Sequence, residues 1–236
     1  MSEGAGLGLE IQSRLGDDAD SYNEWIASRF RPFAGERLLD AGSALGNVTR
    51  FFLDRELVIG LDVTEEFTRE ISARFADHQN FRTVVHDLGD PFPPELRAEE
   101  IDTVLCVNVL EHVEEHEGAL RNMHELLVPG GRLLLLVPAL PSLFGTLDEA
   151  DHHFRRYTRA SLAAAVSGAG FAIERIAYTN PVGMLGWFVN GKILRRRLVP
   201  RGHYRLYNRL VPVLGAIERV LPPPLGLSLI CIARKP

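Results

Sequence analysis

The residues of this chain that are best suited to chemistry lie in two short runs. Residues 147–158 read LDEADHHFRRYT and contain His153, and residues 108–113 read NVLEHV and contain His112. A neutral histidine accepts a proton near pH 7, which suits the deprotonation of a hydroxyl or an amine. We predict that His153 is the general base and that His112 is the second candidate. The candidate catalytic residues are His153, His112, Tyr157 and Arg156.

The run that carries His153 also has a purely structural interpretation. In this interpretation His153, which lies between Asp148 and Arg156, fixes a loop and takes no part in chemistry. Arg155 and Arg156 can bind a phosphate or carboxylate group, but adjacent side chains do not point the same way, so we expect one of them to be structural. Tyr157 likewise has both a catalytic and a structural interpretation.

A third run, LLDAGSALGNVTRFF at residues 38–52, has the pattern of a strand, a tight turn and a helix. The strand ends at Asp40, and Gly42 and Gly46 allow the backbone to bend and to approach a ligand closely. Asp62 ends the next expected strand, 22 residues after Asp40, where a carboxylate can accept both hydroxyls of an adenosine ribose. Together the two strand ends predict a nucleoside-binding site.

A parallel sheet is expected to position these runs. Between residues 35 and 137, short apolar runs alternate with segments of helical periodicity, which is the pattern of βα units. Apolar residues spaced three or four apart predict helices near residues 22–30, 67–75 and 120–127. The expected strands are Arg37–Ala41, Leu57–Asp62, Phe81–His86, Ile101–Val107, Gly131–Val137, Phe171–Ala177 and Ser228–Arg234.

The glycine-rich turn and the two strand-end acids resemble class I S-adenosylmethionine-dependent methyltransferases, whose first motif is an acid followed by Gly-x-Gly-x-Gly. Ala44 replaces the middle glycine here. The resemblance implies a Rossmann-like, doubly wound α/β fold with a mostly parallel seven-stranded sheet and an antiparallel last strand. It also implies S-adenosyl-L-methionine as the cofactor. The expected cofactor-binding residues are Tyr22, Asp40, Gly42, Ser43, Gly46, Asp62, Val63, Asp87, Leu88, Asn108 and Val109.

The resemblance extends beyond the cofactor motifs and covers residues 20–234. NVLEHV followed by PGGRLLLLVP is similar to the subgroup that acts on small molecules, lipids and sugars. Residues 147–158 are similar to the Asp-x(4)-His-x-Arg-Arg-Tyr loop of a bacterial subgroup often found near or fused to glycosyltransferases. His152 replaces a usual glycine in that loop, and Phe154 a usual tyrosine. The implied activity is methyl transfer to a small-molecule, sugar or lipid-linked acceptor, with oxygen favoured over nitrogen and carbon.

Three other interpretations compete with this one. A nicotinamide-dependent dehydrogenase would have glycines where this chain has Ala44 and Asn47. A catalytically silent cofactor-binding protein or partner subunit remains open. Some related methyltransferases hold a divalent ion with Glu-x-x-Glu-His and a later histidine, but here the first position is Asn108 and a hard cation loses a carboxylate. We therefore expect no metal. His112 also has a structural interpretation, in which it packs near the cofactor or holds the turn and does no chemistry.

We expect one methyltransferase domain over residues 1–236. An N-terminal helical segment at 1–34 precedes a cofactor-binding half at 35–137, and a substrate-side half follows at 138–236. In that half, a helix is expected to begin at the N-cap Thr158, and a helical insertion at 183–221 is expected to end at three consecutive prolines.

Composition places the chain among globular proteins. It has 236 residues, of which 46% are hydrophobic and 24% charged. Cys106 and Cys231 lie in apolar runs without paired spacing, so we expect reduced core residues in a cytoplasmic protein. The first twenty residues lack the pattern of a secretory leader, and the longest apolar stretch, 181–191, is too short to span a bilayer.

The charge is unevenly distributed. The net charge of −5 argues against general nucleic-acid binding, yet residues 181–217 hold seven basic side chains and no acid. A basic, partly amphipathic segment on an acidic body predicts a local anionic partner. The insertion at 183–221 is thus expected to cover the site of an anionic acceptor, to touch a membrane peripherally or to form a homodimer.

Overall fold

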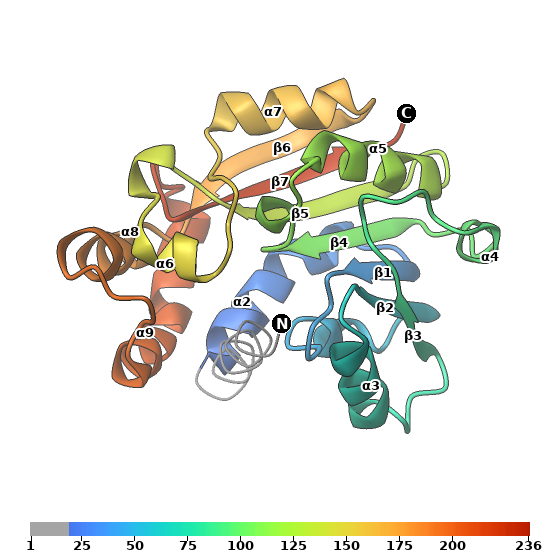
Figure 1. Cartoon of the computed structure of the whole chain (residues 1–236), viewed down its shortest axis with the longest axis horizontal. Helices are drawn as coiled ribbons and strands as arrows, with labels where there is room; N and C mark the ends of the chain where they lie inside the picture. The colour runs from blue at the N-terminus through green and yellow to red at the C-terminus, as the bar shows by residue number, and fades with distance from the viewer. Residues whose placement is uncertain (1–18) are drawn as a thin grey trace.

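The computed structural model describes residues 19–236. The expectations for residues 1–18, that they carry no leader and begin a helical segment, lie outside the described residues. The described chain forms a seven-stranded sheet in the order β3-β2-β1-β4-β5-β7-β6, with helices on both faces (Figure 1).

The sheet confirms the expected fold class. Strands β1 to β5 run parallel to one another, while β7 is antiparallel to both β5 and β6. Three strands have the predicted bounds, and the other four differ by one or two residues at one end or at both. The strands are β1 Arg37–Ala41, β2 Leu57–Asp62, β3 Phe81–Val85, β4 Thr103–Val107, β5 Arg132–Pro138, β6 Ala172–Thr179 and β7 Ser228–Arg234.

The helices follow the apolar periodicity with two differences. The helix expected after the glycine turn is only a 3-10 turn, Thr49–Phe52, and the polar loop after β5 contains a short helix, α6. Thr158 caps α7 as expected, since its hydroxyl accepts the N–H of Ser161 at 3.0 Å. The α-helices are α2 Asp20–Phe30, α3 Glu65–Arg74, α4 Pro94–Arg97, α5 His116–Leu126, α6 Thr146–Ala150, α7 Arg159–Gly168, α8 Pro181–Trp187 and α9 Arg201–Val220.

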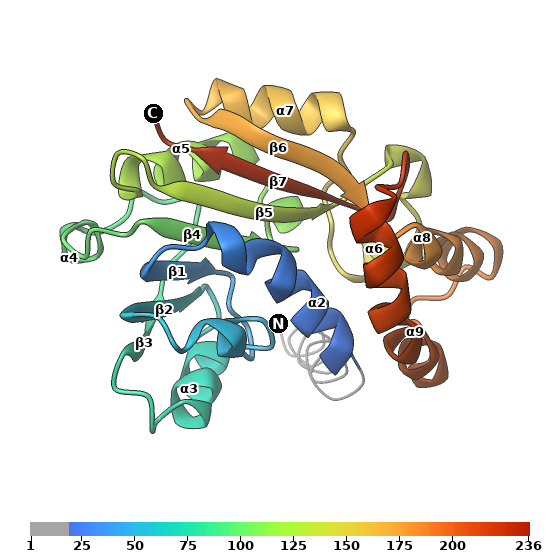
Figure 2. The ribbon, with the colours of Figure 1, turned by 180° about the vertical axis from the view of Figure 1, so that it is seen from behind.

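The core has two layers because side chains alternate across each strand. On β1, Leu39 faces the layer formed with α5 and α7, whereas Leu38 faces the layer formed with α2. Figure 2 shows α2 and α9 on this second face, where Phe30 and Val211 are buried. Both cysteines are buried and unbonded, as expected. None of the helices within residues 19–236 is long and apolar enough to cross a bilayer.

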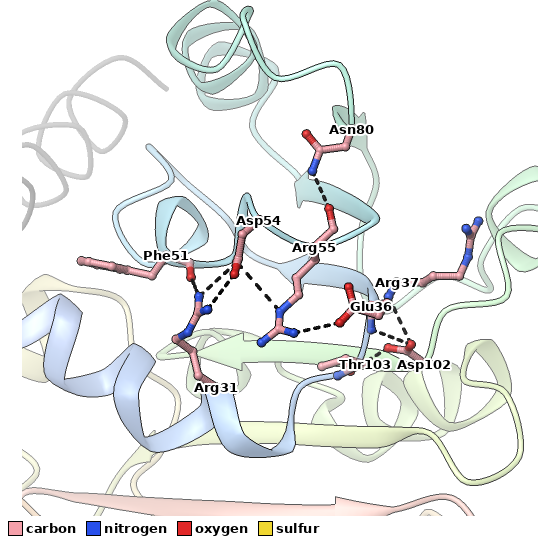
Figure 3. Close-up of polar contacts among 10 residues, drawn as sticks. Arg31, Glu36, Arg37, Phe51, Asp54, Arg55, Asn80, Asp102 and Thr103 are labelled. Atoms are coloured by element: carbon pink, nitrogen blue, oxygen red, sulfur yellow. Dashed lines mark hydrogen bonds and ion pairs between the residues drawn. The ribbon is translucent and has the colours of Figure 1, made fainter.

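The amino end of the sheet is fastened by polar contacts (Figure 3). The Asp102 carboxylate accepts the backbone N–H groups of Glu36 at 2.8 Å and Arg37 at 3.1 Å, which joins the starts of β1 and β4. The Arg31 guanidinium donates two hydrogen bonds to Asp54 at 3.1 and 2.7 Å. This end of the sheet is therefore held together by contacts within the protein.

Candidate active site

The carboxyl ends of the parallel strands surround a cavity of about 1100 Å³. Ligands of open α/β sheets bind at this edge. Strands β1 and β2 contribute Asp40 and Asp62, and Asn108 follows β4. Residues of α2, α8 and α9 form the facing wall, so segments far apart in the sequence enclose one space (Figure 1).

The turn after β1 has a backbone that only small residues allow. Gly42 has a φ of 82°, and a Cβ there would lie 2.3 Å from the Val109 side chain. The N–H groups of Gly42 and Ser43 donate to the Leu61 carbonyl at 2.7 and 2.9 Å, which ties the turn to β2. Ala44 has a φ of 45°, in the left-handed region where glycine is favoured. This conformation explains why the Gly-x-Gly-x-Gly motif that the turn resembles has its middle glycine at this position.

Asp62 supports the turn and also lines the cavity. Its Oδ2 accepts the N–H of Ala44 at 3.0 Å and its Oδ1 accepts the N–H of Thr64 at 2.9 Å. Burial raises the pKa of Asp62 although these backbone hydrogen bonds favour the ionised form. Its side chain is thus held in one orientation at the cavity wall.

Asp40 lies deeper in the same wall. Burial and the nearby charge of Asp62 raise the pKa of Asp40 to about 7, although the Thr49 hydroxyl donates to its Oδ2 at 2.5 Å. The buried Ser43 hydroxyl also lines the cavity and has no hydrogen-bond partner within the described residues. Buried polar groups are normally paired, so this hydroxyl is available to a ligand.

Ten of the eleven residues expected to bind the cofactor line the cavity, and Gly46 does not. Gly46 has a φ of 73°, and a Cβ there would lie 2.7 Å from both Ile71 and Phe75. Gly46 therefore allows the turn to pack closely against α3 and the residue that follows it, and its place beside the cofactor stays a prediction. The ten are Tyr22, Asp40, Gly42, Ser43, Asp62, Val63, Asp87, Leu88, Asn108 and Val109.

Asp148 is the centre of the second predicted run. Its buried carboxylate accepts from His153 Nδ1 at 2.9 Å and from Arg156 Nε at 2.6 Å. It also accepts the N–H of Gly145 at 3.0 Å and the indole N–H of Trp187 at 3.2 Å. One acid thus joins α6, the following loop and α8, which agrees with the loop-fixing interpretation of this run.

The arginines and the tyrosine of this run are held by protein groups. Arg156 donates to the Ala139 carbonyl at 2.9 Å and lies over the Trp187 ring, although it also lines the cavity. Arg155 donates to the backbone carbonyls of Val113 and Glu114. Both arginines, rather than one, therefore have structural contacts.

Tyr157 is buried and does not line the cavity. Its hydroxyl lies 3.2 Å from His116 Nδ1, and burial raises its pKa. These contacts agree with the structural interpretation of Tyr157, and its catalytic role stays a prediction.

The two candidate bases lie side by side at the cavity wall. The rings of His112 and His153 meet edge to face, with centroids 4.7 Å apart. His153 Nε2 lies 3.2 Å from Asp151 and 4.0 Å from Glu111. Burial opposes protonation of His153, but its hydrogen bonds to Asp148 and Asp151 prevail and raise its pKa to about 9.

The raised pKa favours the protonated form of His153 and so works against a role as a ready general base, a role that stays a prediction. Burial and the charge of His153 lower the pKa of His112. The Glu111 carboxylate beside them is 0% exposed, and burial raises its pKa to about 7.

Several cavity residues were not predicted. Val182, Leu185, Leu206 and Leu210 come from α8 and α9, and Asn180 caps α8 from a left-handed conformation with a φ of 62°. In the sequence these residues appear only as an ordinary apolar periodicity and an Asn-Pro pair. Their closeness to the strand ends depends on how the insertion folds back.

Known proteins match this chain in sequence and in structure. A family described as a methyltransferase domain matches residues 17–176. A protein of transposon TN4556 from Streptomyces fradiae is 30% identical over 68% of this chain, and the chain spans 50% of that protein's length. The ubiquinone biosynthesis O-methyltransferase of Xanthomonas axonopodis is 28% identical over 65% of this chain and 70% of its own length.

The fold is also shared with a solved structure of low sequence identity. Magnesium protoporphyrin IX methyltransferase from Synechocystis, crystallised with bound S-adenosylhomocysteine, has a TM-score of 0.60 and 16% identity. The match covers 96% of this chain and 87% of that chain. Because the sequence identity is only 16%, this comparison supports the fold and nothing further.

Proposed function

This chain belongs to the methyltransferase-domain family, and from that premise we propose that it transfers a methyl group from S-adenosyl-L-methionine to an oxygen of a small-molecule, sugar or lipid-linked acceptor. The observation that carries the proposal is one cavity lined both by the glycine turn with its two acids and by the histidine cluster. A cofactor bound at the glycine turn would direct its methyl group toward the histidine cluster, whose side chains can accept a proton.

The residues of the turn fit this cofactor. The Ser43 hydroxyl is buried and has no hydrogen-bond partner within the described residues, and Gly42 lets the turn pack closely against Val109. Asp62 stands where two ribose hydroxyls can donate to one carboxylate. Asp40 supplies negative charge near a cofactor that carries a sulfonium and an ammonium group.

Methyl transfer from a sulfonium is an in-line displacement that spreads the positive charge of the sulfur. A close-fitting, dry pocket that aligns the nucleophile, the methyl carbon and the sulfur can contribute about 7–11 kcal/mol. The acceptor oxygen loses its proton during the transfer. Glu111, His112 and His153 lie close together in the cavity wall and are the groups that can accept it. Of the two imidazoles, His112 has the lowered pKa, which favours the unprotonated form that can accept a proton.

The acceptor side of the cavity favours a ligand with apolar parts. Leu185 and Val189 line it from the insertion, and Leu206 and Leu210 line it from α9. Exposed arginines, among them Arg195 and Arg197, lie on the same insertion. These features support an acceptor that combines an apolar body with an anionic group.

Substitution of Asp62 tests the cofactor assignment. We expect Asp62→Ala to weaken binding of S-adenosylmethionine by about 1.5–3 kcal/mol, because a charged acceptor of hydrogen bonds is lost. Asp62→Asn, which keeps one oxygen for the turn, separates ribose recognition from turn support. The control is Glu65→Gln, since Glu65 lies on exposed α3 close by. Equal calorimetric affinities for wild type and both Asp62 variants would refute the assignment.

A further inference from the structure

One carboxylate in the cavity wall has no partner. Glu111 follows β4, its side chain is fully buried, and neither carboxylate oxygen has a hydrogen-bond partner among residues 19–236. The nearby His153 Nε2 lies 4.0 Å from Glu111 Oε1, within ion-pair range but too far for a hydrogen bond. A buried carboxylate without hydrogen bonds destabilises the folded state, and a cation bound beside it would supply a closer positive charge.

Two imidazoles complete a donor set around this carboxylate. One ligand atom from each of Glu111, His112 and His153 can be chosen so that all three lie within 4.8 Å of one another. Bonds of about 2.1 Å to a single cation place neighbouring ligand atoms about 3–3.5 Å apart. A movement of about an ångström, within the range of side-chain rotation, therefore closes the three around one ion.

His153 is already oriented as a ligand. Its Nδ1 bonds to Asp148 at 2.9 Å, which leaves Nε2 directed toward Glu111 and Asp151. A carboxylate on the far nitrogen of an imidazole is the arrangement that orients metal-binding histidines and increases their basicity. Asp151, 3.2 Å from Nε2, adds a carboxylate at the same place.

We propose that Glu111, His112 and His153 bind a divalent first-row transition-metal ion, with Asp151 as a further ligand. Two nitrogen donors with carboxylate oxygens favour Zn²⁺, Mn²⁺, Fe²⁺ or Co²⁺ over Mg²⁺ and Ca²⁺. The sequence-based expectation of no metal rested on the amide at Asn108. Asn108 is outside this donor set, and Asp151 supplies a carboxylate that the sequence spacing does not reveal.

A metal ion at this site would take part in the proposed methyl transfer, and the inference about its role rests on that proposed function. The site lines the cavity, so an acceptor hydroxyl can take an open coordination position. The bound hydroxyl releases its proton to solvent at lower pH than a free one, because the cation stabilises the oxyanion. The oxyanion then forms the new O–CH₃ bond as the C–S bond of the cofactor breaks, giving a methyl ether and S-adenosylhomocysteine. The implied acceptor class is a compound with an ionisable hydroxyl.

Metal binding is tested without any acceptor. The chain is treated with a chelator, dialysed and titrated with Co²⁺ while visible absorption is recorded, and then with Zn²⁺ as competitor and Mg²⁺ as control. We expect one Co²⁺ per chain, displaced by Zn²⁺ and not by Mg²⁺. Glu111→Gln should weaken Co²⁺ binding at least tenfold, whereas Glu114→Gln, also at the cavity wall, should not change it.

A histidine pair provides a second comparison in case Glu111→Gln alters the fold. His153→Gln should weaken binding at least tenfold and its neighbour His152→Gln should not, with melting temperatures recorded for all four variants. Absence of a Co²⁺ spectrum, or equal binding by the variants of each pair, would overturn the proposal. Calorimetry with S-adenosylhomocysteine on the metal-free chain is independent of this result: if it binds while Co²⁺ does not, only the metal site fails.

Discussion

At the scale of single residues, environment rather than residue type separates the acids of the site. Asp148 is saturated by four donors and is structural. Asp62 accepts two backbone N–H groups and still faces the cavity, whereas Glu111 is buried without a partner. The sequence predicts Asp62 because a strand end fixes its place. It also offers the loop-fixing interpretation of Asp148, because three of the four donors to this acid lie within residues 145–156. It does not reveal the environment of Glu111, because the segments that bury this side chain are brought together only by the fold.

Asp40 gives a pH dependence that calorimetry can measure. Its pKa is raised to about 7, so at pH 6 the carboxyl is mostly neutral and at pH 7.5 mostly ionised. A cationic cofactor pairs with the ionised form, so the affinity for S-adenosylmethionine should rise between pH 6 and pH 7.5. If the bound cofactor lowers this pKa by one unit, the rise is limited to about tenfold.

The control for this dependence is Asp40→Asn, which keeps the size of the side chain and cannot ionise. The variant should bind S-adenosylmethionine with nearly constant affinity over the same range, apart from contributions of other groups such as Asp62. If wild type and Asp40→Asn show the same pH profile, Asp40 does not carry the effect.

At the scale of elements, the strands were predictable and the connections less so. Apolar runs bounded by turn residues predicted all seven strands, because a parallel sheet covered on both faces needs continuous apolar segments. The segment after the glycine turn contains Asn47, Val48 and Thr49, which are weak helix formers, and it makes only a 3-10 turn. The general motif predicted a helix there, and the local residues explain why it is absent.

Gly46 and Gly130 form a matched pair that tests the packing of the glycine turn. Both have positive φ, 73° and 80°, but a Cβ at Gly46 meets Ile71 and Phe75, while one at Gly130 meets nothing within 4 Å. Gly130→Ala should therefore cost only the backbone penalty of about 1–2 kcal/mol. Gly46→Ala should cost about 1–3 kcal/mol more because of overpacking.

Urea denaturation measures both free energies of unfolding. A larger loss for Gly46→Ala than for Gly130→Ala is expected, together with weaker cofactor binding only in the Gly46 variant. Equal losses of stability would contradict the close packing of the turn against Ile71 and Phe75.

At the scale of the whole molecule, the insertion differs from the body in charge and in surface. The five apolar residues Leu206, Leu210, Val213, Ile217 and Val220 follow one another at spacings of four and three along α9. All are exposed, while Val211 on the same helix is buried and anchors α9 to the body. The sequence predicted a basic helical insertion and gave covering the acceptor site as one of three roles for it. It did not show which of its residues line the cavity, since that depends on contacts between α9 and α2.

We propose that this exposed stripe and the neighbouring basic residues dock on an anionic lipid surface, from which an apolar acceptor can enter the cavity. An amphipathic helix with basic residues binds such a surface through buried apolar area and charge attraction. Each basic residue near an anionic membrane contributes about 1 kcal/mol. Arg196 is bonded to the Asn190 side chain at 2.9 Å, so the informative changes are at the exposed Arg195 and Arg197.

The double variant Arg195→Glu/Arg197→Glu should reduce binding to phosphatidylglycerol vesicles at least tenfold, and binding to phosphatidylcholine vesicles should be weak in both proteins. The control is Arg69→Glu/Arg121→Glu, which makes the same change of charge on α3 and α5. The difference should shrink as salt is added, because exposed charges are screened over about 10 Å at 0.1 M. If sedimentation shows instead that wild type is a dimer and that the Arg195/Arg197 variant dissociates without any loss of lipid binding, the stripe is an interface between two copies and the membrane proposal is wrong. If both double variants bind anionic vesicles as wild type does, the basic residues form an ordinary solvated surface.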